Sequence, residues 1–170
     1  RTVAKIEYQN AVRFIKDIIV ASDAVMIARR DLGVECKMEE LPIIQRRIIK
    51  KCLEIGRPVI VATHMLESMI ENPIPTRAEI TDVANAVFEQ ADAVMLSGET
   101  ATGKYPVECV KVLDRVARRI ALSGGAGYAS SAILETQRQK TVHAAVTLAN
   151  SLENAKLILF TREGRMADEA

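Results

Sequence analysis

The sequence has little that would mark a disulfide-bonded, metal-binding or membrane-spanning protein. It contains three cysteines, an odd number without a C-x-x-C pair, and only two histidines, which lie far apart. A disulfide framework or a zinc site is therefore not expected, and a reducing cytoplasm fits the cysteine content better. No apolar run approaches the roughly 18–20 residues of a membrane span, so no membrane segment is expected.

An excess of charge of one sign is also absent. The 23 Lys and Arg residues balance 22 Asp and Glu residues, which leaves a net charge of +1. Proteins that bind nucleic acid usually carry an excess of positive charge, which this sequence lacks. We therefore expect no nucleic-acid partner. Of the 170 residues, 49% are hydrophobic and 26% are charged, a composition typical of a folded domain.

The two ends of the sequence resemble interior segments of a longer chain. Residues 1–5 show neither an initiator Met nor a signal-peptide pattern, and they have the character of a strand interior. Residues 166–170 resemble the first turns of a helix. We therefore expect the sequence to be a fragment.

Four short β-rich runs alternate with helical patterns. Their apolar character is nearly continuous, which is typical of parallel strands covered on both faces. The second and fourth runs are near copies, which indicates a repeated unit. The expected strands are residues 2–7, 23–29, 58–63 and 92–97, and the expected helices lie at 11–19, 41–55, 78–90 and from Pro106 onward.

This alternation predicts an α/β fold with a parallel sheet and right-handed crossovers. A doubly wound sheet and part of a (β/α)8 barrel both fit the pattern. We expect a first unit over residues 1–122, a linker over 123–135 and the beginning of a second α/β domain over 136–170. In that last part the pattern predicts a helix over 136–151, a strand over 156–160 and a polar loop over 161–165.

In either architecture, ligands bind at the carboxyl ends of the strands. Lys5 and Glu7 end the first strand, and their i, i+2 spacing places both on one face. Glu7 and Asp31 are suited to hold Mg²⁺, and Lys5 to neutralise charge on a transferring phosphoryl group or an enolate. The alternative is a set of solvated charges at strand ends. The other polar residues at strand ends are Arg29, Arg30, Thr63, His64 and residues 97–100.

A second candidate site is the segment from Gly98 to Lys104, which follows a strand and precedes a helix. It is one residue away from the phosphate-binding pattern G-x-x-x-x-G-K-[ST], because Tyr105 stands where a hydroxyl ligand for Mg²⁺ is required. The alternative is an ordinary glycine-containing turn between a strand and a helix.

Several motifs together resemble one family, pyruvate kinase. The residues within these motifs, their order and their spacing all match the family. The match runs through residues 1 to about 120 and continues more loosely to 170. The motifs are Asp31-Leu32-Gly33-Val34-Glu35, Ala62-Thr63-His64-Met65-Leu66-Glu67-Ser68-Met69, Pro75-Thr76-Arg77-Ala78-Glu79, Asp82-Val83-Ala84-Asn85-Ala86-Val87 and Leu96-Ser97-Gly98-Glu99-Thr100-Ala101.

The resemblance implies a partial (β/α)8 barrel, consisting of its last four β-α units, followed by the start of the C-terminal α/β domain. The first half of the barrel, the lid domain and most nucleotide and monovalent-cation contacts would then be absent. The resemblance further implies a cytoplasmic glycolytic enzyme that forms homo-oligomers, tetramers in the family. We expect the fragment alone to be inactive. Because of its open sheet edges, we also expect it to associate, to rearrange its sheet or to be only the retained part of a larger molecule.

The implied reaction transfers a phosphoryl group from phosphoenolpyruvate to ADP and yields pyruvate and ATP, with Mg²⁺ or Mn²⁺ and K⁺. By position, Lys5 resembles the lysine that stabilises the phosphoryl group and the enolate. Glu7 and Asp31 resemble the divalent-metal ligands, and Thr63 resembles the threonine that assists enolate protonation. The substrate-binding residues implied are Arg29, Arg30, Asp31 and Thr63.

The sequence departs from the family pattern near the site. Arg30 replaces a glycine whose backbone approaches the substrate carboxylate, His64 replaces a glutamine, and Tyr8 replaces a small polar residue. These changes keep open a second hypothesis, in which the protein is a diverged and non-catalytic member of the family.

An effector loop is the last feature that the resemblance implies. Residues 161–165 resemble a loop that binds a sugar-phosphate activator in some members, with Thr161, Arg162, Gly164 and Arg165 as candidate contacts. Glu163 and Met166 replace hydroxyl residues there, so we expect no activation by a fructose bisphosphate.

Overall fold

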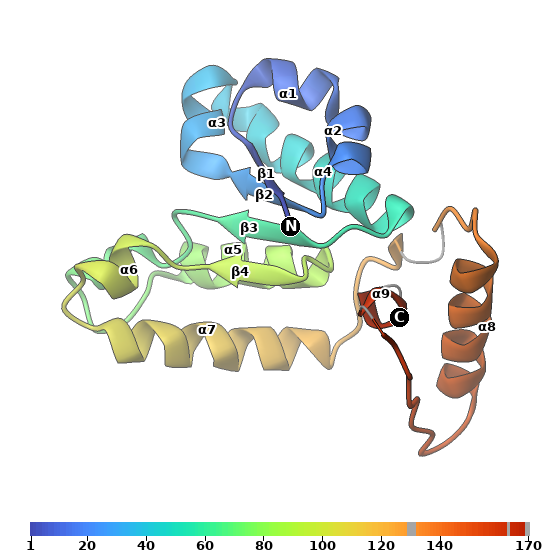
Figure 1. The fold of residues 1–170 in the computed structure, drawn as a ribbon. Helices are drawn as coiled ribbons and strands as arrows, with labels where there is room; N and C mark the ends of the chain where they lie inside the picture. Colours follow the sequence, from blue (N-terminus) through green and yellow to red (C-terminus); the bar gives the residue numbers. More distant parts are fainter. Residues whose placement is uncertain (129–131, 163, 169–170) are drawn as a thin grey trace.

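The computed structural model describes residues 1–128, 132–162 and 164–168 and shows an open parallel sheet flanked by helices (Figure 1). The strands follow one another in the order β1-β2-β3-β4, and each neighbouring pair is parallel. The four expected strands and their parallel pairing are thus confirmed. Their bounds are β1 (Val3–Ile6), β2 (Ala24–Ala28), β3 (Val59–Ala62) and β4 (Ala93–Met95).

Helices connect the strands and follow the last one. The expected helix over residues 11–19 is divided at Phe14, where the backbone departs from helical angles (φ −104°, ψ 24°). Helices that were not expected begin directly after β2 and shortly after β4. The elements are α1 (Gln9–Arg13), α2 (Ile15–Ala21), α3 (Arg29–Glu35), the 3-10 helix η1 (Met38–Glu40), α4 (Leu41–Ile55), the 3-10 helix η2 (Glu67–Ile70), α5 (Arg77–Phe88), α6 (Gly98–Ala101) and α7 (Pro106–Ala121).

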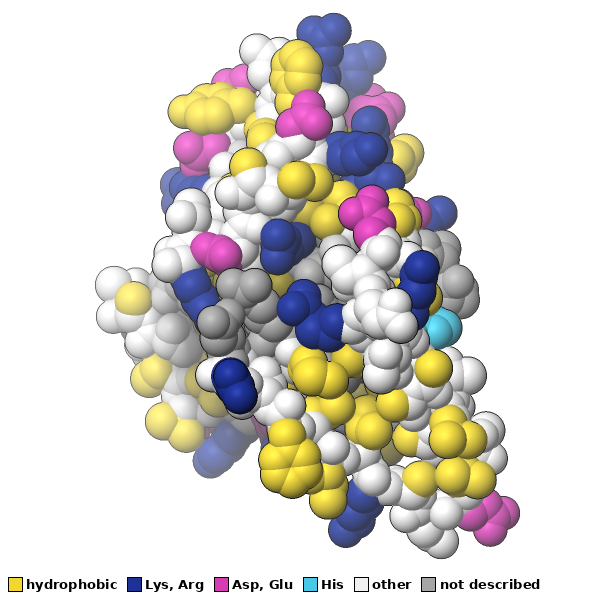
Figure 2. All heavy atoms as spheres, turned by 45° about the vertical axis from the view of Figure 1, so that its right-hand side comes forward, with side chains coloured by type: hydrophobic (Ala, Val, Ile, Leu, Met, Phe, Trp, Pro, Cys, Tyr) yellow, Lys and Arg dark blue, Asp and Glu magenta, His cyan; other side chains and the backbone are white. Residues whose placement is uncertain are grey.

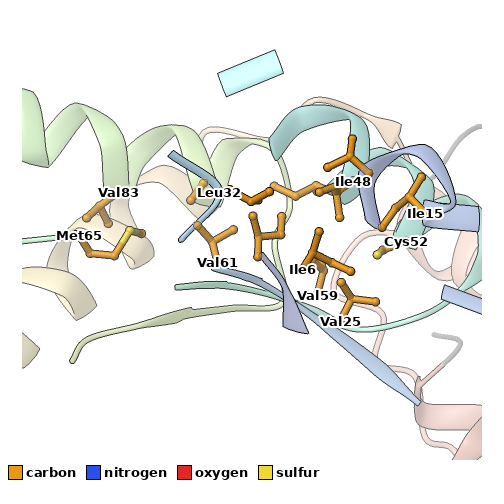
Figure 3. Packing of buried hydrophobic residues seen from close by; sticks show 14 of the residues in the cluster. Ile6, Ile15, Val25, Leu32, Ile48, Cys52, Val59, Val61, Met65 and Val83 are labelled. Carbon is orange, nitrogen blue, oxygen red and sulfur yellow. The ribbon is translucent and has the colours of Figure 1, made fainter. Parts of the chain in front are cut away.

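The hydrophobic core lies between one face of the sheet and the helices (Figure 3). Val25, Val59 and Val61 are fully buried there and belong to one cluster with Ile48 of α4. Burial of a side chain of this size stabilises the fold by about 1.5–3 kcal/mol. On the opposite face Lys5 is paired in register with Met26, which is only partly buried. Helices therefore cover one face of this sheet more completely than the other.

The sequence repeat at the second and fourth strands has a structural counterpart. The Asp23 carboxylate accepts a hydrogen bond from the Thr2 N–H at 2.6 Å, and the Asp92 carboxylate accepts one from the Val59 N–H at 2.8 Å. Each aspartate thus ties the start of its own strand to the start of the preceding one. The repeated letters reproduce the same inter-strand contact twice.

The strand expected over residues 156–160 is not formed, and this prediction was wrong. The segment follows α8 (Gln137–Ser151) and precedes α9 (Arg165–Asp168). A strand requires a neighbour for its backbone hydrogen bonds, and no other strand lies beside this segment within the described residues. Ile158 and Phe160 are accordingly 77% and 89% exposed. In the view of Figure 2, hydrophobic side chains lie on the lower part of the molecule. Cationic side chains interspersed with acidic ones lie above them.

The segment between α7 and α8 is attached to the first unit by backbone hydrogen bonds. The Ala126 N–H donates to the Phe88 carbonyl at the end of α5, and the Ile133 N–H donates to the Glu54 carbonyl near the end of α4, both at 2.8 Å. Residues 129–131 lie outside the described part of the chain. The domain boundaries at 122 and 135 stay a prediction.

The start of α5 is fixed by a network around Glu79. Thr76 and Glu79 form a capping box, in which the Thr76 hydroxyl accepts from the Glu79 N–H and the Glu79 carboxylate accepts from the Thr76 N–H. The same carboxylate accepts hydrogen bonds from the N–H and the hydroxyl of Ser68, at 2.7 and 2.5 Å. Partial burial acts to raise the pKa of Glu79, but these hydrogen bonds outweigh it and lower the pKa.

We expect Glu79→Gln to lower the free energy of unfolding by about 1–2 kcal/mol at pH 7. Because the pKa of Glu79 is lower in the folded state, this contribution is complete above the unfolded pKa of about 4.3 and is lost as the pH falls through the folded pKa. Urea unfolding at pH 7 and pH 3 measures it, with the exposed Glu35→Gln as control. An equal effect of the two substitutions at pH 7 would contradict this role.

Candidate active site

The carboxyl ends of β1 and β2 bring a lysine and two carboxylates together. The Lys5 ammonium lies 2.6 Å from a Glu7 carboxylate oxygen and 2.9 Å from a carboxylate oxygen of Asp31. Lys5 and Glu7 lie on one face because they are two residues apart at the end of β1. Asp31 comes from the first turn of α3, where the helix dipole favours a negative charge. The expected convergence of these three residues is present.

Contacts within this triad set its protonation. Hydrogen bonds to Glu7 and then to Asp31 raise the pKa of Lys5. The hydrogen bond from Lys5 is the main cause that lowers the pKa of Asp31. Lys5 therefore stays protonated and Asp31 ionised throughout the neutral pH range. The triad offers a fixed positive charge beside two carboxylates, and all three side chains remain partly exposed to incoming ligands.

The turn after β3 carries Thr63 in an unusual conformation. Thr63 and His64 both have positive φ angles, of 69° and 52°. For residues other than glycine such angles cost about 1–3 kcal/mol each, so the surroundings must hold the turn. The Thr63 hydroxyl donates to the Ala62 carbonyl at 2.7 Å and accepts from the Arg30 N–H at 3.0 Å. Its oxygen is thus held in one position at the end of the sheet.

Arg29 and Arg30 occupy different environments although they are adjacent in the sequence. Arg29 is only 7% exposed, and its guanidinium donates to Asp82 and to the carbonyls of Thr63 and His64. Arg30 belongs to α3 and has no positive φ angle, so its backbone conformation does not require a glycine. Of these two arginines, only Arg30 lines the cavity at the strand ends.

A cavity of about 120 Å³ adjoins the Thr63 turn and includes a carboxylate that the sequence analysis assigned no role. Glu99 is 2% exposed and accepts hydrogen bonds from the Ser97 N–H at 2.7 Å and the Leu66 N–H at 3.2 Å. The available signal was an acidic residue four positions beyond the end of β4, but the burial of Glu99 depends on distant segments such as the one that contains Leu66. The lining residues are Arg30, Thr63, His64, Glu67, Ile70, Ser97, Gly98 and Glu99.

The segment from Gly98 to Lys104 does not form a phosphate cradle. A phosphate-binding loop presents backbone N–H groups to its ligand, whereas the N–H groups of Thr100 to Lys104 donate to carbonyls within the protein. The Lys104 ammonium is paired with Glu71. Gly103 is required by packing, because a Cβ there would lie 2.5 Å from the Glu99 carbonyl oxygen. The segment contains the short helix α6 and connects β4 to α7.

The candidate effector loop is exposed at Thr161. The Gly164 N–H donates to the Thr161 hydroxyl at 2.9 Å, and Gly164 has a φ of 82°. Arg162 is exposed. Residue 163 and the side chain of Arg165 lie outside the described structure. The expectation of no sugar-phosphate activation stays a prediction.

Comparison with known proteins decides the family. The family model of the pyruvate kinase barrel domain matches residues 1–110. The chain belongs to the pyruvate kinase family. It is 49% identical to the pyruvate kinase of Thermotoga maritima over 92% of this chain and 34% of that protein. It is 48% identical to the chloroplastic pyruvate kinase isozyme G of Ricinus communis over 97% of this chain and 40% of that protein.

A solved structure supports the same assignment. A pyruvate kinase from Cryptosporidium parvum superimposes with a TM-score of 0.93 at 38% identity, covering 98% of this chain and 35% of that one. The chain thus spans about a third of the length of the pyruvate kinases it matches. Its open sheet is a part of the barrel, which settles the choice between a doubly wound sheet and a partial barrel.

Pyruvate kinases in general use a divalent metal, and the Glu7–Asp31 pair is chemically suited to one. Mg²⁺ is usually held by one or two carboxylates, with substrate oxygens and water completing the shell. Within the described residues no group of three or more His, Cys, Asp or Glu side chains is placed to hold a metal. No helix in the described part of the chain has the length and apolarity to cross a membrane.

Proposed function

We propose that this chain contributes one side of a pyruvate kinase active site. The reaction transfers a phosphoryl group from phosphoenolpyruvate to ADP and gives pyruvate and ATP, with Mg²⁺ or Mn²⁺ and K⁺. The observation that carries the proposal is the Lys5 ammonium within hydrogen-bond distance of both Glu7 and Asp31 at the carboxyl ends of the strands. It supports phosphoryl transfer because that reaction depends on positioned charges rather than on a covalent intermediate.

Each residue has a defined part in this proposal. Glu7 and Asp31 would hold the divalent metal, which neutralises negative charge on the phosphoryl oxygens. Lys5, kept protonated by its carboxylate neighbours, stabilises charge on the phosphoryl group and on the enolate that remains. The Thr63 hydroxyl, fixed by Ala62 and Arg30, assists delivery of a proton to the enolate carbon to form pyruvate.

The test is ADP-dependent release of pyruvate from phosphoenolpyruvate, measured with Mg²⁺ and K⁺ on the protein at its natural length. We expect turnover there and none from residues 1–170 alone. Absence of turnover in a folded, natural-length protein would favour the second candidate, a non-catalytic member of the family, to which Arg30, His64 and Tyr8 point.

Arg30→Gly separates these two candidates. The contact that positions Thr63 uses the backbone N–H of residue 30, which glycine retains, so we expect kcat to change by less than about threefold. The phosphoenolpyruvate KM is measured alongside, because the Arg30 side chain lines the cavity. A gain in kcat of more than about tenfold would instead show that the side chain obstructs the site.

Assembly and compartment belong to the same proposal. Both outer strands, β1 and β4, have a free edge within the described residues, and such edges favour pairing with further strands. Independently of these edges, which the other strands of the barrel would cover in the natural-length protein, we propose a homo-oligomer, a tetramer as in the family, which light scattering on that protein tests. The three free cysteines favour a reducing compartment, for which we propose the cytoplasm. Fractionation that places the protein in a plastid, as the name of the Ricinus relative states for that protein, would contradict this.

A further inference from the structure

The Thr63–His64 turn needs an external support, because two successive residues other than glycine hold left-handed backbone angles. Within the described residues, the only hydrogen bond from a side chain of this turn to the neighbouring backbone runs from the Thr63 hydroxyl to the Ala62 carbonyl, at 2.7 Å. That bond orients the hydroxyl but does not fix the carbonyl groups of the turn. The carbonyl groups are bound instead by a residue that lies 34 positions earlier in the sequence.

The guanidinium of Arg29 binds both carbonyls of the turn. Its Nε and one terminal nitrogen donate to the Thr63 carbonyl at 3.1 and 2.7 Å, and the same terminal nitrogen donates to the His64 carbonyl at 3.0 Å. The other terminal nitrogen donates to an Asp82 carboxylate oxygen of α5 at 2.6 Å. A planar fork of fixed donors can make these contacts together, whereas a lysine ammonium cannot reproduce them.

The first turn of α3 therefore holds Thr63 from two sides. The Arg29 side chain fixes its carbonyl, and the Arg30 N–H fixes its hydroxyl at 3.0 Å. Arg29 is buried, its charge is compensated by Asp82, and it does not line the cavity at the strand ends. Its donors are directed at the protein rather than at a ligand.

We infer that Arg29 is a positioning residue that acts on the reaction through Thr63, rather than a residue that contacts substrate. Arg29 and Asp82 form a clamp between α3, the Thr63 turn and α5. The clamp keeps the Thr63 hydroxyl where enolate protonation requires it, so this inference rests on the proposed function. Small displacements of a positioned group are enough to reduce a rate about 100-fold.

The test is a double-mutant cycle on the natural-length protein with Arg29→Lys, Thr63→Ala and both together. We expect Arg29→Lys to lower kcat by about 10- to 100-fold with a smaller change in the phosphoenolpyruvate KM. In the Thr63→Ala background the same substitution should cost less than about threefold, because the group it positions is gone. An equal fold loss in both backgrounds would overturn the inference.

Arg46→Lys is the matched control. Arg46 also binds a buried carboxylate, that of Glu89 at 3.0 Å, but it does not touch the turn or line the cavity at the strand ends. We expect its replacement to leave kcat unchanged. If Arg29→Lys does not fold, Asp82→Asn takes its place in the cycle and should give the same pattern with a smaller loss.

A second readout does not depend on activity. Hydrogen exchange of the Arg30 amide, followed by NMR, should accelerate by more than about tenfold in Arg29→Lys, because its acceptor, the Thr63 hydroxyl, is no longer fixed. Unchanged exchange would overturn the clamp. If the unmodified protein shows no turnover, the proposed function fails, and this exchange measurement alone decides whether Arg29 positions the turn.

Discussion

Replacing Lys5 by methionine is expected to reduce kcat by about a thousandfold or more. Methionine keeps much of the length of the side chain but removes the ammonium that lies within 3 Å of both Glu7 and Asp31. The positive charge of Lys5 is then no longer present to stabilise the transferring phosphoryl group and the developing enolate. Steady-state kinetics of pyruvate formation on the natural-length protein measures this loss.

Two controls define what the Lys5 result means. Lys5→Arg keeps the positive charge and should retain more activity than Lys5→Met, although it changes the geometry. Lys104→Met removes a lysine that is paired with Glu71, outside the triad. We expect it to keep nearly full activity. Loss of activity in Lys104→Met together with full activity in Lys5→Met would instead assign the active site to the Gly98–Lys104 segment.

Replacing Glu7 by glutamine or Asp31 by asparagine is expected to raise the Mg²⁺ concentration needed for half-maximal activity by at least about 100-fold. Residues that only support metal ligands typically change affinity by about 10- to 100-fold, and a ligand should change it more. The measurement is a Mg²⁺ titration of activity together with direct Mn²⁺ binding. The exposed Asp17→Asn on α2 is the control and should leave both unchanged.

The two experiments are linked by the position of Lys5. Because its ammonium lies beside both proposed ligands, Lys5→Met should bind Mn²⁺ at least as tightly as the unmodified protein while it loses turnover. Glu7→Gln should lose both. If Lys5→Met loses metal binding as well, the assignment of separate roles to the lysine and the carboxylates is wrong.

The pH dependence of metal binding follows from the pKa of Asp31. The hydrogen bond from Lys5 lowers that pKa, so Asp31 stays ionised as the pH falls from 7 to well below neutrality. Protonation of Asp31 should therefore weaken metal binding only when the pH approaches this lowered value. In Lys5→Met the pKa of Asp31 returns toward its ordinary value, and the acid limit of Mn²⁺ binding should move to higher pH.

The contrast between Arg29 and Arg30 shows why neighbouring residues in one motif take different roles. Both follow β2, and the sequence marks both as candidates for substrate contact. The turn of α3 directs the side chain of Arg29 inward to Asp82, whereas Arg30 lines the cavity near Thr63. The Arg30 backbone still donates to the Thr63 hydroxyl, so the replaced glycine leaves that contact in place.

The sequence by itself determined the alternation of strands and helices, the parallel pairing and the edge of the sheet where the candidate site residues converge. These depend on local patterns: continuous apolar runs, helical spacing and the two-residue period that places Lys5 and Glu7 on one face. The family motifs can also be recognised directly in the amino-acid sequence. Such features need no knowledge of distant contacts.

Only the tertiary structure decided what depends on residues far apart in the chain. The contact of Arg29 with Asp82 spans 53 positions, and the burial of Glu99 depends on a contact with Leu66, 33 positions away. The strand expected over 156–160 fails for the same reason, since strand formation depends on a partner and not on β propensity alone. Propensity and spacing are local, whereas the direction, burial and charge state of a side chain are set by what packs against it.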